Sequence, residues 1–159
     1  MHVAVIGIGQ SLRGDDAAGL EAVRLWQSVH PETARRPDVR VGSVEGSGLE
    51  LIELLQGMDA AVLVDAVSSD APAGTVHRIG LEALSNMPGD SAAAHGWGVR
   101  NVLRLAAALQ PENGRLDIRL LGVETAQIEV GRCLSKAVQT ALPALSEAIE
   151  EQVAALLRA

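Results

Sequence analysis

Aromatic residues are almost absent from this 159-residue chain, which has no phenylalanine, no tyrosine and only two tryptophans, Trp26 and Trp97. Apolar residues still make up 48% of it, so its core must be built from alanine, valine, leucine and isoleucine. Aliphatic packing of this kind is typical of helices that cover a parallel sheet. A chain of this length usually forms one core, and we expect residues 1–159 to be a single domain.

Cysteine is also scarce. The single Cys133 cannot form an internal disulfide, and there is no second cysteine with which it could hold zinc. Because no His or Asn lies near it in the sequence, we expect a buried or chemically inert thiol. The apolar start VAVIGIG is shorter than a signal-peptide core, and no other run approaches membrane-spanning length. These absences predict a soluble, cytoplasmic protein with no membrane partner.

Positive charge is in the minority, and the formal net charge is −7. Affinity for nucleic acid comes mainly from Lys and Arg side chains that neutralise phosphates, so we expect no nucleic-acid partner. The acidic residues are dispersed without an acidic run, and most of them should lie on solvated surfaces.

Five apolar, β-branched runs predict the strands of one sheet. They are Val3 to Ile8, Val39 to Val44, Ala60 to Val67, Thr75 to Ile79 and Leu116 to Leu121. The connection SSDAPAG before the fourth run is too short for a parallel crossover, so that strand should be antiparallel.

Helical spacing of apolar residues predicts the helices between these strands. They cover Ala18 to Val29, Leu49 to Leu55, Val99 to Leu109 and Ser135 to Leu157, the last with a kink at Pro143. Together the elements predict an α/β fold, a three-layer α/β/α sandwich around a mixed, mostly parallel five-stranded sheet.

A glycine-rich loop, GIGQSLRGDD, follows the first strand. A dinucleotide fingerprint would need glycine where the chain has Leu12, and a phosphate loop would need Lys and Ser or Thr where it has Asp15 and Asp16. We therefore expect no bound nucleotide. Asp15 is predicted to cap the following helix, which leaves Asp16 for another role.

Asp65 interrupts the otherwise apolar run AAVLVDAV, with no Lys or Arg nearby to pair with it, which favours a functional role. With a strand order of 2-1-3, Asp16 and Asp65 would flank the crevice where open α/β sheets bind ligands. His95, in a long irregular stretch, could add an imidazole, and this set of donors suits nickel or zinc. We expect His2, His30 and His77 to be structural. No GxSxG motif is present to mark a serine nucleophile.

The segments GIGQSLRGDDAAG, EGSGLELIELL, VLVDAV and AAAHGWGV resemble, in this order, the sequence pattern of the [NiFe]-hydrogenase maturation peptidases. The chain departs from the pattern at Gln10, where Asn is usual, and at Ala17, where Gly is common. The resemblance implies that Asp16, Asp65 and His95 form a nickel-recognition site, with Asp16 and Asp65 as the catalytic carboxylates.

This resemblance also implies a function. The family removes a C-terminal extension from a [NiFe]-hydrogenase large-subunit precursor after nickel insertion, with nickel supplied by the precursor as the recognition signal. Whether the metal activates water or a carboxylate acts as general base stays open. Two alternatives remain, a non-catalytic nickel-binding chaperone and a small-molecule hydrolase on the same fold.

Overall fold

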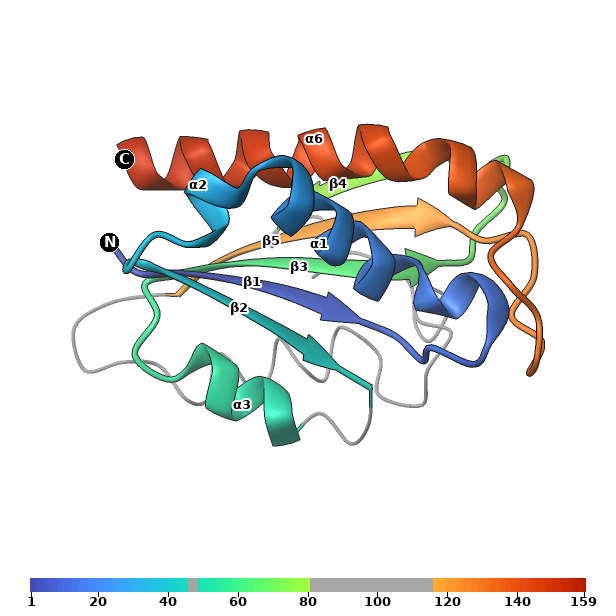
Figure 1. The fold of residues 1–159 in the computed structure, drawn as a ribbon, viewed down its shortest axis with the longest axis horizontal. Helices are drawn as coiled ribbons and strands as arrows, with labels where there is room; N and C mark the ends of the chain where they lie inside the picture. Colours follow the sequence, from blue (N-terminus) through green and yellow to red (C-terminus); the bar gives the residue numbers. More distant parts are fainter. Residues whose placement is uncertain (46–48, 81–115) are drawn as a thin grey trace.

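The structure is a computed structural model that describes residues 1–45, 49–80 and 116–159. Its elements are shown in Figure 1. In chain order they are β1 (Val3–Ile8), the 3-10 helix η1 (Gly14–Ala17), α1 (Ala18–Val29), α2 (Pro31–Ala34), β2 (Val39–Val44), α3 (Leu49–Leu55), β3 (Ala60–Val67), β4 (Val76–Gly80), β5 (Asp117–Glu124) and α6 (Lys136–Arg158).

The five strands form one sheet in the order β2-β1-β3-β5-β4. The first four in this order run parallel, and β4 pairs antiparallel with β5. This topology confirms the mixed, mostly parallel sheet, and the predicted order 2-1-3 places the switch point between β1 and β3. The fifth strand begins and ends later than predicted, since it reaches Glu124.

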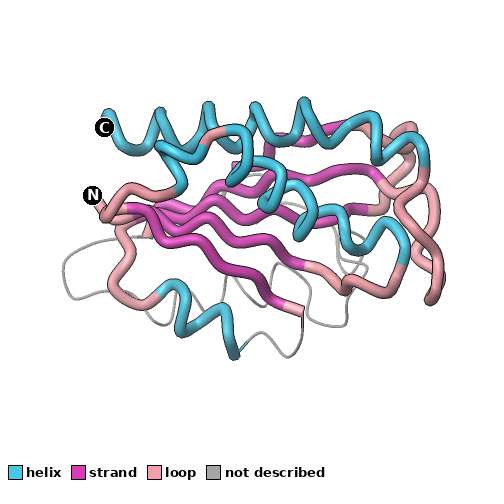
Figure 2. Tube along the Cα trace, viewed as in Figure 1, coloured by secondary structure: helices cyan, strands magenta, loops and turns pink. Residues whose placement is uncertain are grey.

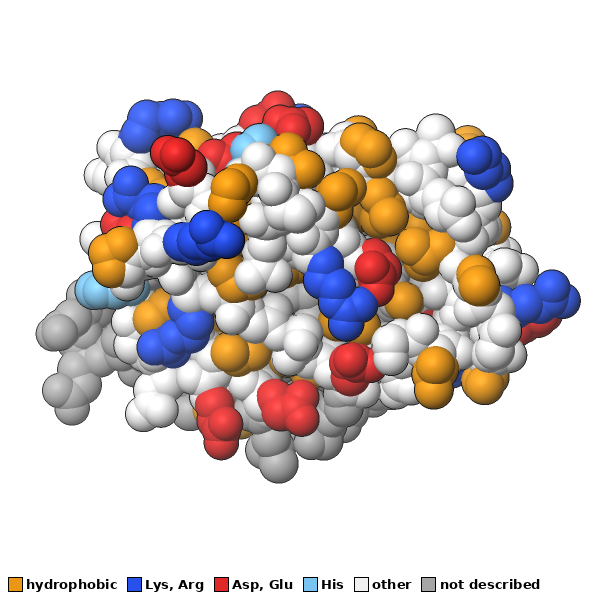
Figure 3. All heavy atoms as spheres, viewed as in Figure 1, with side chains coloured by type: hydrophobic (Ala, Val, Ile, Leu, Met, Phe, Trp, Pro, Cys, Tyr) orange, Lys and Arg blue, Asp and Glu red, His pale blue; other side chains and the backbone are white. Residues whose placement is uncertain are grey.

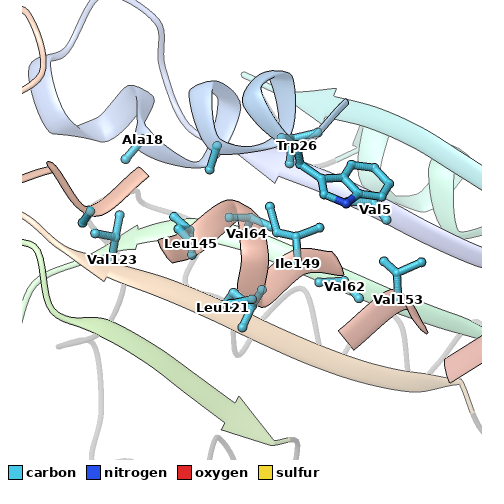
Figure 4. Packing of buried hydrophobic residues seen from close by; sticks show 14 of the residues in the cluster. Val5, Ala18, Trp26, Val62, Val64, Leu121, Val123, Leu145, Ile149 and Val153 are labelled. Atoms are coloured by element: carbon cyan, nitrogen blue, oxygen red, sulfur yellow. The ribbon is translucent and has the colours of Figure 1, made fainter. Parts of the chain in front are cut away.

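Helices cover both faces of the sheet, as Figures 1 and 2 show. On one face α1 and α6 pack over side chains that include Val5, Val62 and Leu121, and Figure 4 shows this layer. On the other face α3 packs over a second cluster that includes Ile6 and Leu63. The layers are therefore those of the predicted sandwich.

Trp26 is the largest fully buried side chain in the described part of the chain. It lies between α1 and α6, and its Nε1 donates to Glu150 Oε2 over 2.8 Å. A buried indole needs an acceptor for its N–H, and Glu150 supplies it. This contact fixes α6 against α1.

Some predictions met a different outcome. The short α2, Pro31–Ala34, was not predicted, because the apolar pattern ends at His30. The predicted helix from Val99 to Leu109 lies outside the described residues, and Pro143 lies inside the continuous helix α6.

None of the described helices combines the length and the apolar character that crossing a membrane requires. Charged side chains of both signs are dispersed over the face in Figure 3.

Candidate active site

Three glycines bring the start of α1 against the carboxyl ends of β1 and β3. A Cβ on Gly19 would lie 2.3 Å from the carbonyl oxygen of Val64 and 2.5 Å from that of Ile8. A Cβ on Gly9 would lie 2.0 Å from the carbonyl oxygen of Asp16, and one on Gly7 would lie 2.7 Å from that of Gly19. Because all these atoms are backbone, any larger residue would push the helix away. The glycines of GIGQSLRGDDAAG therefore set how closely η1 and α1 approach the sheet.

Asp15 connects this loop to the segment before α6. Its Oδ2 accepts hydrogen bonds from the main-chain N–H groups of Ala126 (2.8 Å) and Gln127 (3.1 Å), and its Oδ1 accepts one from Ser135 (2.6 Å). Asp15 is fully buried, and its own N–H donates to the Gln127 carbonyl over 2.9 Å. Ser135 in turn caps α6 through Val138 N. One carboxylate thus holds two loops and the start of the last helix.

The prediction that Asp15 caps the following helix is wrong. Residue 13 precedes η1, Ala17 precedes α1, and neither start has a side-chain cap. The carboxylate turns instead toward a loop more than 110 residues along the chain, which provides three donors. A carboxylate with several main-chain donors is satisfied as well as one at a helix cap. The role is still structural, as expected, but it joins distant segments.

Asp16 and Asp65 both lie at the carboxyl ends of the central strands. Asp16 is 1% exposed on η1, which packs on β3, and Asp65 is 2% exposed near the end of β3. Asp65 lies on the α3 side of the sheet, as Leu63 does, because side chains alternate along a strand. Its Oδ1 accepts from Ala66 N over 2.8 Å. The structure therefore brings both predicted acids to the same edge of the sheet.

The third predicted residue, His95, lies outside the described residues. Within residues 1–45, 49–80 and 116–159, no group of three or more His, Cys, Asp or Glu side chains is placed to hold a metal ion. Asp16 and Asp65 supply two carboxylates, so any such group here needs a third donor from elsewhere. The assignment of His95 stays a prediction.

The sequence did not reveal one polar cluster at the same end of the sheet. Glu124, at the end of β5, is 1% exposed and accepts hydrogen bonds from the N–H and the hydroxyl of Ser69. His77 Nε2 lies 2.9 Å from Glu124 Oε2. In sequence terms Glu124 ends an apolar strand much as Asp65 does, and that pattern is the signal that could have identified it. The cluster ties the connection between β3 and β4 to β5.

The remaining histidines and the cysteine have simpler settings. His2 and His30 lie beside carboxylates of Asp59 and Glu147, which agrees with structural roles. Cys133 is exposed in the segment before α6, so the expected burial of this thiol is wrong, and its chemical inertness stays a prediction.

Glu45, directly after β2, holds the glycine-rich loop from the opposite side. Its Oε2 accepts from the Ser11 hydroxyl over 2.8 Å and from Ser11 N over 3.1 Å. These hydrogen bonds, the one from the hydroxyl first, lower the pKa of the Glu45 carboxyl below its usual value. The loop that presents Asp16 is therefore fixed both by Asp15 and through Ser11.

Two surface pockets in the described part of the chain lie away from Asp16 and Asp65. One is lined by residues of β2 and α3, including Arg40 and Glu53, and the other by residues of β4 and β5, including Arg78 and Asp117. Neither contains Asp16 or Asp65, so neither indicates an enclosed small-molecule site at the acids.

Comparison with known proteins gives a consistent result. A family model described as a hydrogenase maturation protease matches residues 26–152, which include Asp65 and His95 and begin after Asp16. The hydrogenase expression/formation protein HupD of Thiocapsa roseopersicina is 28% identical over 152 residues. That alignment covers 94% of this chain but only 66% of HupD, so the chain spans just under two thirds of that relative.

Solved structures share the fold along nearly the whole chain. The [NiFe] hydrogenase maturation protease HybD from Thermococcus kodakarensis is 26% identical, with a TM-score of 0.78 over 96% of this chain and 99% of that one. The hydrogenase maturating endopeptidase HybD from E. coli is 22% identical, with a TM-score of 0.72 over 99% of this chain and 93% of that one. The second similarity shows the fold alone.

Proposed function

Because this chain belongs to the hydrogenase maturation protease family, a family of peptidases, we propose that it removes the C-terminal extension of a [NiFe]-hydrogenase large-subunit precursor. The observation that carries the proposal is the pair of buried acids, Asp16 and Asp65, at the β1/β3 edge of the sheet. Open α/β sheets bind their ligands at this edge. With a single cysteine, a reducing compartment is suitable, and we place the reaction in the cytoplasm.

Nickel enters this proposal as cargo of the substrate. Asp16, Asp65 and His95 would offer two carboxylates and an imidazole, a donor set that suits a divalent transition metal. Two or three such ligands are too few for a permanent site, so the precursor's own ligands must complete the coordination. A precursor without nickel lacks the metal that both chains would coordinate, and it therefore binds the enzyme weakly. The metal thus reports that the precursor is ready to be cut.

The buried position of both acids supports a role in hydrolysis as well as in recognition. A carboxylate at the carboxyl ends of β1 and β3 can take the proton from a water molecule that attacks the scissile carbonyl. The metal that the precursor brings can polarise that carbonyl or the water. Burial of Asp16 and Asp65 limits the bulk water around them, which strengthens their interaction with the metal.

The test is incubation with a nickel-loaded precursor, followed by mass spectrometry of the intact precursor. We expect the wild type to remove one peptide from the C-terminus and Asp65→Asn to slow removal at least about 100-fold, the scale of a lost general base. Asp59→Asn is the matched control, because Asp59 directly precedes β3 at the end of the strand opposite Asp65, and its exposed carboxylate accepts a hydrogen bond from His2 N over 2.6 Å.

Two outcomes are informative. Processing by Asp65→Asn at the rate of Asp59→Asn would contradict the role of Asp65. A precursor that binds the wild type but keeps its full mass would favour the nickel-binding chaperone. Equal melting temperatures of the two variants are required for either comparison, because Asn is nearly isosteric with Asp and should leave packing unchanged.

A further inference from the structure

Two exposed apolar side chains lie on neighbouring loops, one of which leads into η1 and Asp16. Leu12, between β1 and η1, is 73% exposed, and Val130, between β5 and α6, is 75% exposed. Gly131 N donates to the Leu12 carbonyl over 2.8 Å, so these loops lie side by side, as Figure 1 shows at the end where α6 begins. Neither side chain belongs to a core cluster of the described residues. Packing of the fold therefore does not account for them.

The main chain under these side chains is held firmly. Gly14 N donates to the Arg132 carbonyl over 3.1 Å, and Asp15 N donates to the Gln127 carbonyl over 2.9 Å. The Asp15 carboxylate adds three more bonds to the same segment. A surface that is already ordered loses little entropy when a partner binds. The two loops thus form a preorganised rim.

Arg13 lies in this rim, three residues before Asp16. Its side chain makes no hydrogen bond or ion pair, within the part of the chain that the structure describes, and its Nε is buried without an acceptor. Arg132, across the rim, differs because its Nε lies 3.2 Å from Glu129 Oε2. A buried donor without an acceptor is unfavourable, and a guanidinium binds carboxylate or carbonyl oxygens strongly. Because the Arg13 guanidinium has no acceptor within the described residues, it can donate a hydrogen bond to an oxygen of a bound chain.

We propose that Leu12, Arg13 and Val130, here called the precursor rim, bind the segment of the precursor next to the cleaved bond. The inference rests on the proposed function, since it names the surface that presents this substrate to Asp16. Leu12 and Val130 cover apolar side chains of the segment, and Arg13 donates to one of its carbonyl or carboxylate oxygens. Continuity with Asp16 favours the precursor over other occupants, because a chain cut there lies against the loops that carry it.

The test is single-turnover cleavage of a nickel-loaded precursor at rising enzyme concentration, with binding measured in parallel by biolayer interferometry. We expect Leu12→Ser, Val130→Ser and Arg13→Ala each to raise the half-saturating concentration and the Kd about tenfold. The maximal rate should stay within about twofold, because the rim binds without touching the reacting atoms. Val29→Ser is the matched control, since Val29 is 52% exposed at the far end of α1.

Each outcome decides between the two claims. Rim variants that bind and cut like Val29→Ser would overturn the rim and leave the peptidase function standing. A wild type that binds the precursor but never cuts it would overturn the peptidase function. The Kd values of the wild type and the rim variants would still test the rim. A wild type that neither binds nor cuts would overturn both. If sedimentation shows a dimer that Leu12→Ser dissociates, with precursor affinity unchanged, the rim holds a second copy of the chain and the proposal is wrong.

Discussion

Replacement of Asp15 by serine should destabilise the protein strongly, although serine is a good helix cap. The Asp15 carboxylate receives three main-chain N–H groups, at distances of 2.6, 2.8 and 3.1 Å, from the segment before α6. The shorter, uncharged hydroxyl of serine cannot reach all three. Asp15→Ser therefore separates the cap interpretation, which expects little change, from the role that the structure shows.

The size of the effect follows from these bonds. A hydrogen bond to a charged acceptor contributes about 1.5–3 kcal/mol, and an N–H group that regains water recovers part of this. Because the three N–H groups are only partly buried, we assign about 1 kcal/mol to each and expect a loss of about 3 kcal/mol. In a domain of this size, that loss lowers the Tm by about 6–12 °C.

Urea unfolding at pH 7, followed by circular dichroism, measures this loss. Asp117→Ser is the control, because the Asp117 side chain is 53% exposed and its partner is Arg119 at 3.3 Å. Such a surface pair contributes at most about 1 kcal/mol. Equal stability of the two variants would show that Asp15 does not hold the segment before α6.

Two further predictions concern the loops around Asp16. Gly19→Ala should cost about 3 kcal/mol or more, because its Cβ would lie 2.3 Å from the Val64 carbonyl oxygen, whereas Gly80→Ala, with nothing within 4 Å, should change stability little. Thermal unfolding compares them, and equal melting temperatures would contradict the close approach of α1. Ser11→Ala should raise the lowered pKa of Glu45 toward its ordinary 4.5. A carboxyl whose pKa is lower in the folded than in the unfolded protein stabilises the fold at pH values above its unfolded pKa. The stability that Ser11→Ala loses should therefore be largest at pH 7 and should shrink below about pH 4.5. A difference that is the same at pH 3 would refute this role for Ser11.

Strong local patterns in the sequence predict most of the fold. The runs from Val3 to Ile8 and from Ala60 to Val67 are almost wholly apolar, Asp65 being the one charged residue, as buried central strands require, and the structure confirms the predicted bounds of both. The order 2-1-3, which we assume for an open α/β sheet, agrees with the observed order of β2, β1 and β3. The apolar alternation predicts a strand that ends at Leu121, whereas β5 continues to Glu124.

Contacts between distant segments could not be predicted in the same way. Asp15 stands where a helix cap is expected, and only the fold shows that its donors come from Ala126, Gln127 and Ser135. Likewise, Glu124 meets Ser69 and His77 only because β4 folds back on β5. A sequence pattern reports local propensity and burial, whereas a carboxylate bonds whichever donors the tertiary structure brings to it.

The central claim is that the protein cuts a precursor that carries nickel and ignores one that does not. The most direct measurement compares initial cleavage rates on nickel-loaded and nickel-free samples of the same large-subunit precursor, with enzyme dialysed free of metal. We predict that the loaded precursor loses its C-terminal peptide at least about 100-fold faster, because its metal joins the two chains through Asp16 and Asp65. Equal rates on both samples, or stoichiometric nickel retained by the dialysed enzyme, would contradict recognition of the precursor's metal.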